Sequence, residues 1–540
     1  MKRLLNVAKR MGATTALLTL CSVLFIASSA RAQGVTTGAM AGLVTNTQMQ
    51  PVAGASVIAI HEPSGTTYEA VTRADGRFSI LGMRVGGPYS VSVNFVGTGA
   101  AFEPKTVTNL TVSLGTSTDV NVEVRPIAVQ ETVTVTATAP DAVFSSSRTG
   151  ASTTATREDI AILPTVSGRI SDITRLTPQA SGNSFAGQDN RLNNITVDGS
   201  FFNNSFGLGG QPGDRTGVAP ISLESIEQVQ VSIAPFDVRQ GSFIGAAVNT
   251  VTRSGTNQLT ASFYHRFRND SMVGTESSGN TVNPGTFSFR DTGVWAGGPI
   301  VRNKWFLFGS YEKQSDVRPL TTFTANAGGQ TVGGNTTRVL ASDLDTLSAF
   351  LSSKFGYNTG AYSGINKNTP AKPFLFKTDY NLSPSNKVTL RYSQLDSSSD
   401  QNLSGSSSLG FGRGTFGTNF LNYAGSNYSI MENYKSTIGE WDSIIKNTMS
   451  NSLIIGYTTN NESRGDIGTL FPFVDILDGA GVAYTSFGSE PFTPHNELRY
   501  KTFQAQNNFT KFGAKHTLTF GLALEKYKDR KSTRLNSSHT

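Results

Sequence analysis

Cysteine is almost absent from this chain of 540 residues. The one cysteine, Cys21, lies within a stretch that we expect to be removed on export. The mature chain is therefore predicted to have no disulfide, no cysteine-ligated metal and no thiol nucleophile.

Histidine is also scarce, and the five present are scattered. None has a partner at metal-ligand spacing, so no metal site is predicted. His61 begins the string HEPSG, which we interpret as a loop rather than as a hydrolase site. Because no nucleophile, base and orienting residue group together, the sequence disfavours an enzyme and indicates no cofactor.

Charge is sparse as well, at 15% of residues. The formal net charge of +7 comes from the basic residues of 1–32 and of 529–540, and the remainder of the chain is balanced. The high isoelectric point is therefore no sign of nucleic-acid binding. Abundant Gly, Ser, Thr and Asn, together with aromatics, favour strands and turns over helices.

Long apolar runs are missing. A basic start at Lys2 and Arg3, an apolar stretch at 16–27 and Ala30-Arg31-Ala32 predict a Sec signal peptide over 1–32, cleaved before Gln33. A spanning helix is the alternative, but about 12 apolar residues fall short of the ~20 required. If the exported chain enters a membrane, it must do so as a β-barrel, because only helices and closed barrels satisfy every backbone group there.

Residues 34–126 show short alternating runs separated by turn residues such as Asp75-Gly76. About seven short strands in this length predict a small β-sandwich. The order resembles the carboxypeptidase-regulatory-like domain, a module that is not a peptidase. The resemblance rests on Gly42, 51–57, Ser64-Gly65, 75–78 and Pro88-Tyr89.

Residues 127–150 form a predicted linker. Within it lies an alternating string: Glu131, Thr132, Val133, Thr134, Val135, Thr136 and Ala137. Such alternation favours an extended strand, and a strand-prone linker is one interpretation. The string also resembles a TonB box, which implies that the periplasmic protein TonB adds it as a strand to its own sheet.

Residues 151–257 mix helix and strand signals. Thr156 and Asp159 resemble a capping box, and Ile170, Ile173 and Leu176 would share one helical face, ending at 177–178. The segment 221–235 predicts a short helix and then a strand with Val229 and Val231 on one face.

The ordered signals at 163–164, 176–178, 193–200, 222–231 and 245–257 resemble the plug domain of TonB-dependent outer-membrane receptors. The resemblance makes Asp198-Gly199 a turn of the plug. The positions that carry the motif are Asn194, Ile195, Val197, Asp198, Gly199, Gly245, Asn249, Gly255 and Asn257.

From 258 to 528, alternating strands of ~10 residues are separated by polar loops, as in transmembrane barrels. In NKVTLRYSQ, Val388, Leu390 and Tyr392 share one face; the other face carries Lys387, Thr389, Arg391 and Ser393. NSLIIGYTT and KHTLTFGLALE repeat the rule. The strand, turn and aromatic strand at 295–312 resemble the barrel start of Oar-like (OmpA-related) receptors.

The predicted fold is therefore mostly β: a sandwich, an α/β plug, and the first part of a barrel. We count about nine or ten barrel strands against the ~22 of a plugged transporter, so the barrel is expected to be incomplete and open. Residues 529–539, DRKSTRLNSSH, match a common sequencing adapter codon for codon. We therefore interpret 529–540 as an artefact and expect no strand after 528.

The resemblance implies an exported outer-membrane receptor with three partners: membrane lipid, TonB, and an extracellular ligand whose identity stays open, with an oligosaccharide as one candidate. Loops at 318–370 and 395–430 are expected to contact the ligand. An adhesin or polysaccharide-binding protein without transport is the alternative; an open porin is disfavoured by the plug signals.

Overall fold

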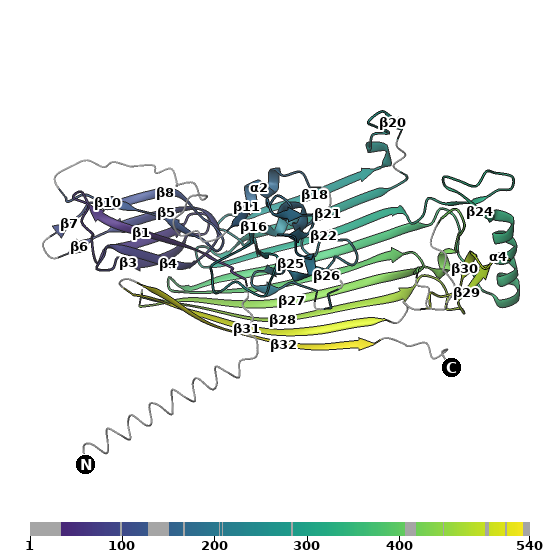
Figure 1. Ribbon diagram of the computed structural model, residues 1–540. Helices are drawn as coiled ribbons and strands as arrows, with labels where there is room; N and C mark the ends of the chain where they lie inside the picture. Colours follow the sequence, from purple (N-terminus) through teal and green to yellow (C-terminus); the bar gives the residue numbers. More distant parts are fainter. Residues whose placement is uncertain are drawn as a thin grey trace, which may run out of the picture.

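The computed structural model describes residues 34–97, 100–127, 151–165, 168–204, 206–207, 209–281, 285–405, 417–446, 448–491, 496–513 and 516–532. They form three bodies in chain order, which we call the N-terminal sandwich (34–126), the central domain (151–257) and the wall sheet (258–532) (Figure 1). The predicted signal peptide and the TonB-box candidate at 131–137 lie outside the described residues. Among the described residues, no helix is long and apolar enough to cross a membrane.

The N-terminal sandwich consists of two four-stranded sheets that enclose one apolar core. The first sheet contains β10 (Val122–Val124), β1 (Gly38–Asn46), β4 (Arg77–Met83) and β9 (Ser117–Asp119); the second contains β3 (Thr66–Val71), β2 (Ser56–His61), β5 (Gly86–Asn94) and β8 (Lys105–Val112). Alternate residues of both sheets, including Met40, Val57 and Tyr89, are buried between them. The predicted β-sandwich is confirmed.

The central domain is built on a five-stranded sheet with two short helices. The strand order is β11 (Ser152–Thr156), β16 (Ile226–Ser232), β17 (Ala247–Thr252), β14 (Asn194–Val197) and β15 (Ser200–Phe201). Val229 and Val231 are buried on β16, as predicted.

The helices of the central domain follow their sequence signals in part. Thr156 caps α2 (Arg157–Ile162) in a capping box with Asp159, as predicted. In α3 (Ile170–Thr174), Ile170 and Ile173 are buried, but the helix ends before Leu176, which is 49% exposed. The prediction for Leu176 was wrong because turns at 174–177 replace the last helical turn.

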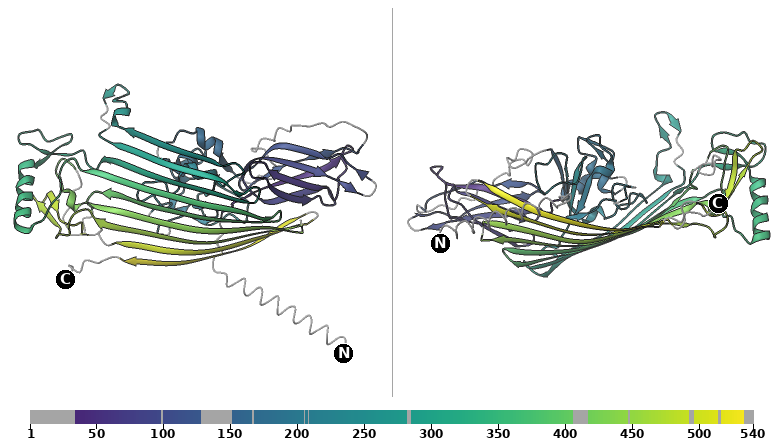
Figure 2. Two further views of the ribbon diagram at one scale, coloured as in Figure 1. Left: turned by 180° about the vertical axis from the view of Figure 1, so that it is seen from behind. Right: turned by 60° about the horizontal axis from the view of Figure 1, so that its bottom comes forward.

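Within the residues that the structure describes, the wall sheet has nine strands, each antiparallel to the next, in the range that the sequence predicts. They are β18 (Thr260–Asn269), β21 (Ser288–Val301), β22 (Trp305–Pro319), β25 (Asn366–Ser383), β26 (Asn386–Gln401), β27 (Tyr428–Ile445), β28 (Met449–Asp466), β31 (Glu497–Phe512) and β32 (Thr517–Ser532). The sheet is open and curved, and the central domain lies in its hollow (Figure 2).

The two faces of the wall sheet differ in chemistry as the alternation predicted. On β26, Leu390 is 45% exposed on the convex side, whereas Arg391 is fully buried against the central domain. Leu518, Phe520, Leu522 and Leu524 of β32 are likewise exposed. An apolar outer face with a polar inner face is the pattern of a transmembrane barrel wall.

Two expectations about strand ends were wrong. Strands of ~10 residues were predicted, but β27 and β28 have 18 each, because main-chain pairing continues past the apolar band. The last strand was expected to end at Lys528, but residues 529–532 pair with 497–500 of β31. Backbone hydrogen bonds do not require alternating side chains, so the pairing persists where the pattern stops.

The connections at one end of the wall sheet fold into a small body that we call the cap, opposite the sandwich (Figure 1). It contains β23 (Thr324–Asn326), β24 (Thr336–Leu340), α4 (Ala341–Phe355), β29 (Val474–Leu477) and β30 (Ala483–Phe487). Leu344, Tyr423 and Phe487, from three different connections, share its core.

Short elements complete the chain. The two-residue strands pair as β6 (Val96–Gly97) with β7 (Ala100–Ala101), β12 (Ala180–Ser181) with β13 (Ser184–Phe185), and β19 (Glu276–Ser277) with β20 (Asn280–Thr281). The 3₁₀ turns are η2 (Asn190–Leu192), η3 (Leu223–Ser225), η4 (Asp270–Met272) and η5 (Ala424–Ser426).

Candidate functional site between the central domain and the wall sheet

The hairpin of β14 and β15 turns at Asp198-Gly199, as predicted. Both residues have positive φ, +46° and +71°, which is the backbone of a two-residue type I′ turn. The Asp198 carboxylate accepts hydrogen bonds from the Thr252 backbone N–H at 2.9 Å and from the Thr252 hydroxyl at 2.6 Å. The turn is thereby fixed to the end of β17.

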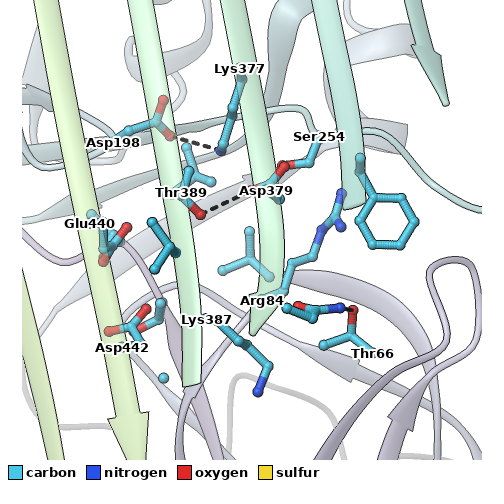
Figure 3. A pocket seen from close by; sticks show the side chains of 18 of the residues that line it. Thr66, Arg84, Asp198, Ser254, Lys377, Asp379, Lys387, Thr389, Glu440 and Asp442 are labelled. Carbon is cyan, nitrogen blue, oxygen red and sulfur yellow. Dashed lines mark hydrogen bonds and ion pairs between the residues drawn. The ribbon is translucent and has the colours of Figure 1, made fainter. Parts of the chain in front are cut away.

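Two cations of the wall sheet converge on the same carboxylate. Lys377 Nζ of β25 lies 3.4 Å from one oxygen of Asp198 (Figure 3), and Arg391 Nε of β26 lies 3.4 Å from the other. The three side chains are at most 7% exposed. Burial opposes ionisation of Asp198, but the two cations and Thr252 outweigh it and hold the pKa of Asp198 below its usual range. This buried ion cluster joins the central domain to the wall.

A small cavity of about 80 Å³ adjoins this cluster, where all three bodies meet (Figure 3). Glu440 and Asp442 of β27 line it, with Lys387 of β26 and Arg84 of the sandwich. Glu227 of the central domain also faces it, and burial raises the pKa of that carboxyl despite the neighbouring arginines. The cavity is thus enclosed by ionisable groups of opposite sign.

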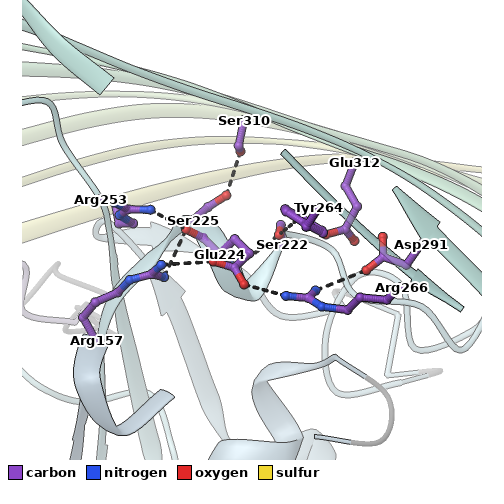
Figure 4. Close-up of polar contacts among 10 residues, drawn as sticks. All are labelled: Arg157, Ser222, Glu224, Ser225, Arg253, Tyr264, Arg266, Asp291, Ser310 and Glu312. Atoms are coloured by element: carbon purple, nitrogen blue, oxygen red, sulfur yellow. Dashed lines mark hydrogen bonds and ion pairs between the residues drawn. The ribbon is translucent and has the colours of Figure 1, made fainter. Parts of the chain in front are cut away.

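A second ionic network lies further along the interface (Figure 4). Glu224 accepts from Arg157 of the central domain at 3.0 Å and from Arg266 of β18 at 2.5 Å, and Arg266 also pairs with Asp291 of β21 at 3.3 Å. Burial works against ionised Glu224, but Arg157 and Arg266 lower its pKa below the usual range.

Arg253 connects this network to the aromatic part of the wall. Its guanidinium donates to the Glu224 carbonyl at 3.2 Å and lies 3.7 Å from the ring centre of Trp295. Burial, with Arg157 nearby, lowers the pKa of Arg253 to about 10, so it stays cationic at neutral pH.

Neutral contacts also join the central domain to the wall sheet. Hydroxyl pairs join Ser200 to Ser436 at 2.8 Å and Ser225 to Ser310 at 2.7 Å. Apolar side chains of both bodies, such as Phe202 and Tyr434 at 4.8 Å between ring centres, share one core. The interface is therefore packed like a domain interior rather than loosely touching.

The motif positions predicted from the sequence fall into two groups. The first surrounds the β14–β17 pair: Asn249 accepts from the Thr196 hydroxyl at 2.9 Å, and Val197 is fully buried. A side chain at Gly245 would meet the Asn193 carboxamide at 2.3 Å. Asn194 donates to the Gly241 carbonyl at 2.8 Å, and the Ile195 N–H donates to Asn203 at 2.7 Å.

The second group lies where the chain enters the wall sheet. A Cβ on Gly255 would be 2.3 Å from the Leu307 carbonyl, so only glycine permits this approach to β22. Asn257 donates to the Asn303 side chain at 2.6 Å and accepts from the Asn303 N–H at 2.8 Å. These two residues anchor the connection and do not reach the ion cluster.

None of the wall residues of the site was predicted to be a site residue, although Arg391 was placed on the polar face of its strand. Lys377, Arg391 and Arg266 are charged residues on a strand face that meets a packed domain. A charge on the inward face of an alternating strand is the signal that could have found them. Within the described parts of the chain, no group of three or more metal-ligating side chains occurs.

Comparisons with known proteins agree with this architecture. The family described as "Outer membrane beta barrel domain" matches residues 251–539, and "Carboxypeptidase regulatory-like domain" matches residues 39–125. "TonB-dependent transporter Oar" of Myxococcus xanthus is 27% identical over 165 residues, which cover 29% of this chain and 15% of that protein.

Two outer-membrane proteins are among the solved structures that match part of this chain. The outer membrane transporter YddB of Escherichia coli is 13% identical, with a TM-score of 0.49, over 70% of this chain and 48% of that one. A ferric enterobactin receptor mutant of Pseudomonas aeruginosa is 14% identical, with a TM-score of 0.43, over 71% and 50%. The chain thus spans at most about half of each relative. All three of these relatives are described as transporters or receptors.

Proposed function

Because the chain belongs to the outer-membrane β-barrel family, we propose that it is a TonB-dependent receptor that binds a ligand outside the cell and imports it with energy delivered by TonB. In this proposal the central domain is the plug, the cap end of the wall sheet faces outward, and the sandwich lies in the periplasm. The outer membrane has no nucleotide supply, so work must arrive through a partner protein.

One observation carries the proposal: a separately folded domain fills the hollow of the wall sheet and is held there by buried ion pairs. A barrel of ~22 strands encloses a lumen that would leak without a plug. Ionic contacts suit a plug that must be released, since water can solvate both partners once they separate.

TonB would grip the string from Glu131 to Ala137 by adding it as a strand. Val133→Pro removes a main-chain donor and should abolish this pairing. We expect site-specific crosslinking of the full chain to the periplasmic domain of TonB to fall at least tenfold in Val133→Pro. Val143→Pro, the same change in the same linker outside the string, should crosslink like the wild type.

Equal crosslinking by both proline variants would show that the string is not a TonB box. The alternative is a surface adhesin that uses the same domains without transport. Two measurements separate a transporter from an adhesin, with oligosaccharides as the candidate ligand class. If the protein imports its ligand, cells with Val133→Pro should grow more slowly on a panel of oligosaccharides. Adhesion of the same cells to immobilised glycans should be unchanged.

A further inference from the structure

The N-terminal sandwich is docked on the central domain through side chains of β16 and β17. The Leu114 N–H donates to Gln228 of β16 at 2.6 Å, and Gln230 of the same strand donates to the Leu114 carbonyl at 2.5 Å. Arg84 donates to the Gly255 carbonyl at 3.1 Å. Both glutamines are nearly fully buried, so the contact excludes water.

An apolar cluster forms between the two domains, separate from the core of either. Val35, Val85 and Leu114 of the sandwich pack with Val251 of β17, and all four are buried. These three sandwich residues do not belong to the sandwich core. They are therefore covered by docking rather than by folding of the sandwich itself.

The segment 34–37, which precedes β1, enters the central domain more deeply. A Cβ at Gly34 would lie 2.0 Å from Asn249 Oδ1 and 2.3 Å from Thr196 Oγ1, so the backbone is pressed onto β17 and β14. Thr36 donates to Glu440 of the wall. The segment is thus placed between the central domain and strand β27.

The sandwich also contacts the wall sheet directly. Asn381 of β25 donates to the Thr66 hydroxyl at 3.0 Å, and Lys387 Nζ of β26 lies 3.9 Å from the ring centre of Tyr68. Arg73 donates to the Gly513 carbonyl between β31 and β32 at 3.2 Å. One rigid domain therefore bridges the plug and the rim of the wall.

We propose that the N-terminal sandwich is a latch. Its docking, with residues 34–37 inserted between the central domain and β27, keeps the central domain seated in the wall sheet until the sandwich undocks. The latch rests on the proposed function, in which the central domain is a plug that TonB displaces. The TonB-box candidate lies between the two docked domains in sequence, so a pull on it loads both of them. The first strand after the linker, β11, pairs with β16, and Gln228 and Gln230 of β16 hold the sandwich.

The docking can be tested without TonB or ligand. A protease site placed at 141–146 of the full chain would allow the linker to be cut, after which docking alone retains the sandwich. We expect the wild-type sandwich to stay bound through size-exclusion chromatography in detergent. Gly34→Leu, which forces side-chain atoms into Asn249 and Thr196, should speed its release at least about tenfold.

Two further variants make the outcome decisive. Gly479→Leu is the matched control, because nothing lies within 4 Å of a Cβ at Gly479; it should release no faster than the wild type. Val85→Asp places a charge in the interdomain cluster and should release the sandwich even if Gly34→Leu fails to fold. Release of the wild-type sandwich on cutting, or retention of it in both latch variants, would overturn the docking.

Hydrogen exchange then tests whether docking restrains the plug. In Val85→Asp, amides of β14 and β17 should exchange at least about tenfold faster, while those of β26 and β27 should not change. If hydrogen exchange in β14 and β17 is unchanged after release, the sandwich does not restrain the central domain, and the latch proposal is wrong. Failure of TonB crosslinking would instead count against import and leave the docking intact.

Discussion

At the scale of single residues, one carboxylate carries the contact between two bodies of the protein. Asp198 fixes a turn within the central domain and also neutralises two cations of the wall sheet. Removing one member of a buried ion cluster leaves the others unpaired in a medium that solvates them poorly. Loss of the Asp198 carboxylate should therefore destabilise the contact between the two bodies as well as the turn itself.

Asp198→Asn should loosen the central domain by about 3–5 kcal/mol, the usual cost of breaking a buried pair. Hydrogen exchange of β17 amides in the full chain would measure it. Asp189→Asn, which breaks an exposed pair with Arg191, should change exchange by little. Because the pKa of Asp198 is lowered, its contribution is full at neutral pH and is lost as pH falls through the folded value. Equal effects of the two variants would contradict this role.

His61 predicts a second pH effect, in the sandwich. Burial, with Arg84 nearby, lowers the pKa of His61 to about 3. Between the ordinary value of 6.5 and 3, the unfolded chain binds one proton more than the folded one. The free energy of unfolding of the sandwich should therefore fall as pH drops below 6.5, by about 1.4 kcal/mol per unit.

Urea unfolding of the full chain at several pH values, followed through hydrogen exchange of β2 and β5 amides, measures how the free energy of unfolding changes with pH. His61→Gln should flatten this slope. His265→Gln, at an exposed position of the wall sheet, should leave it as steep as in the wild type. A slope that survives in His61→Gln would assign the effect to other groups.

At the scale of elements, the turn of β14 and β15 is constrained twice, by its φ and by its surroundings. A Cβ at Gly199 would lie 2.8 Å from Ile454 Cδ1 and 3.0 Å from Thr36 Cγ2. Gly182, between β12 and β13, has a similar φ of +60° with nothing within 4 Å. Substitutions at these two glycines therefore separate the cost of a left-handed backbone from the cost of close packing.

Gly182→Ala should cost about 1–2 kcal/mol, the strain of a left-handed alanine. Gly199→Ala should cost that plus about 1–3 kcal/mol for overpacking against the wall. Urea titration of both variants would measure the difference. If the two substitutions lower the free energy of unfolding equally, the wall sheet adjusts to the added methyl group and the contact at Gly199 is not tight.

The elements also show what the sequence could predict. Alternation with a period of two predicted strands such as β26 because one face is apolar and the other polar. The cap was expected only as loops with ligand contacts, at 318–370 and 395–430. Its core joins Leu344, Tyr423 and Phe487 from distant connections, and no local pattern encodes such pairing. Likewise, the partners of Asp198 come from strands about 180 residues further along the chain.

At the scale of the whole molecule, the convex face of the wall sheet must match hydrocarbon. Leu390→Arg on that face should cost about 2–4 kcal/mol, as expected for arginine near the bilayer centre. Folding of the full chain into phospholipid vesicles at graded urea concentrations would measure it. Ser398→Arg, on the same face near the polar end of β26, should cost much less. Equal penalties would argue against a membrane band at Leu390.

The docked sandwich has one more consequence, which follows from its covalent connection to the domain it touches. Joining two binding surfaces in one chain turns their association into an intramolecular equilibrium, governed by an effective concentration on the order of millimolar. A contact of about 1 μM, tight enough to hold after the linker is cut, would then be open only about one-thousandth of the time. Tension on the linker that separates the two ends lowers that concentration directly. A mechanical pull could thus shift the equilibrium without any change in the contacting side chains.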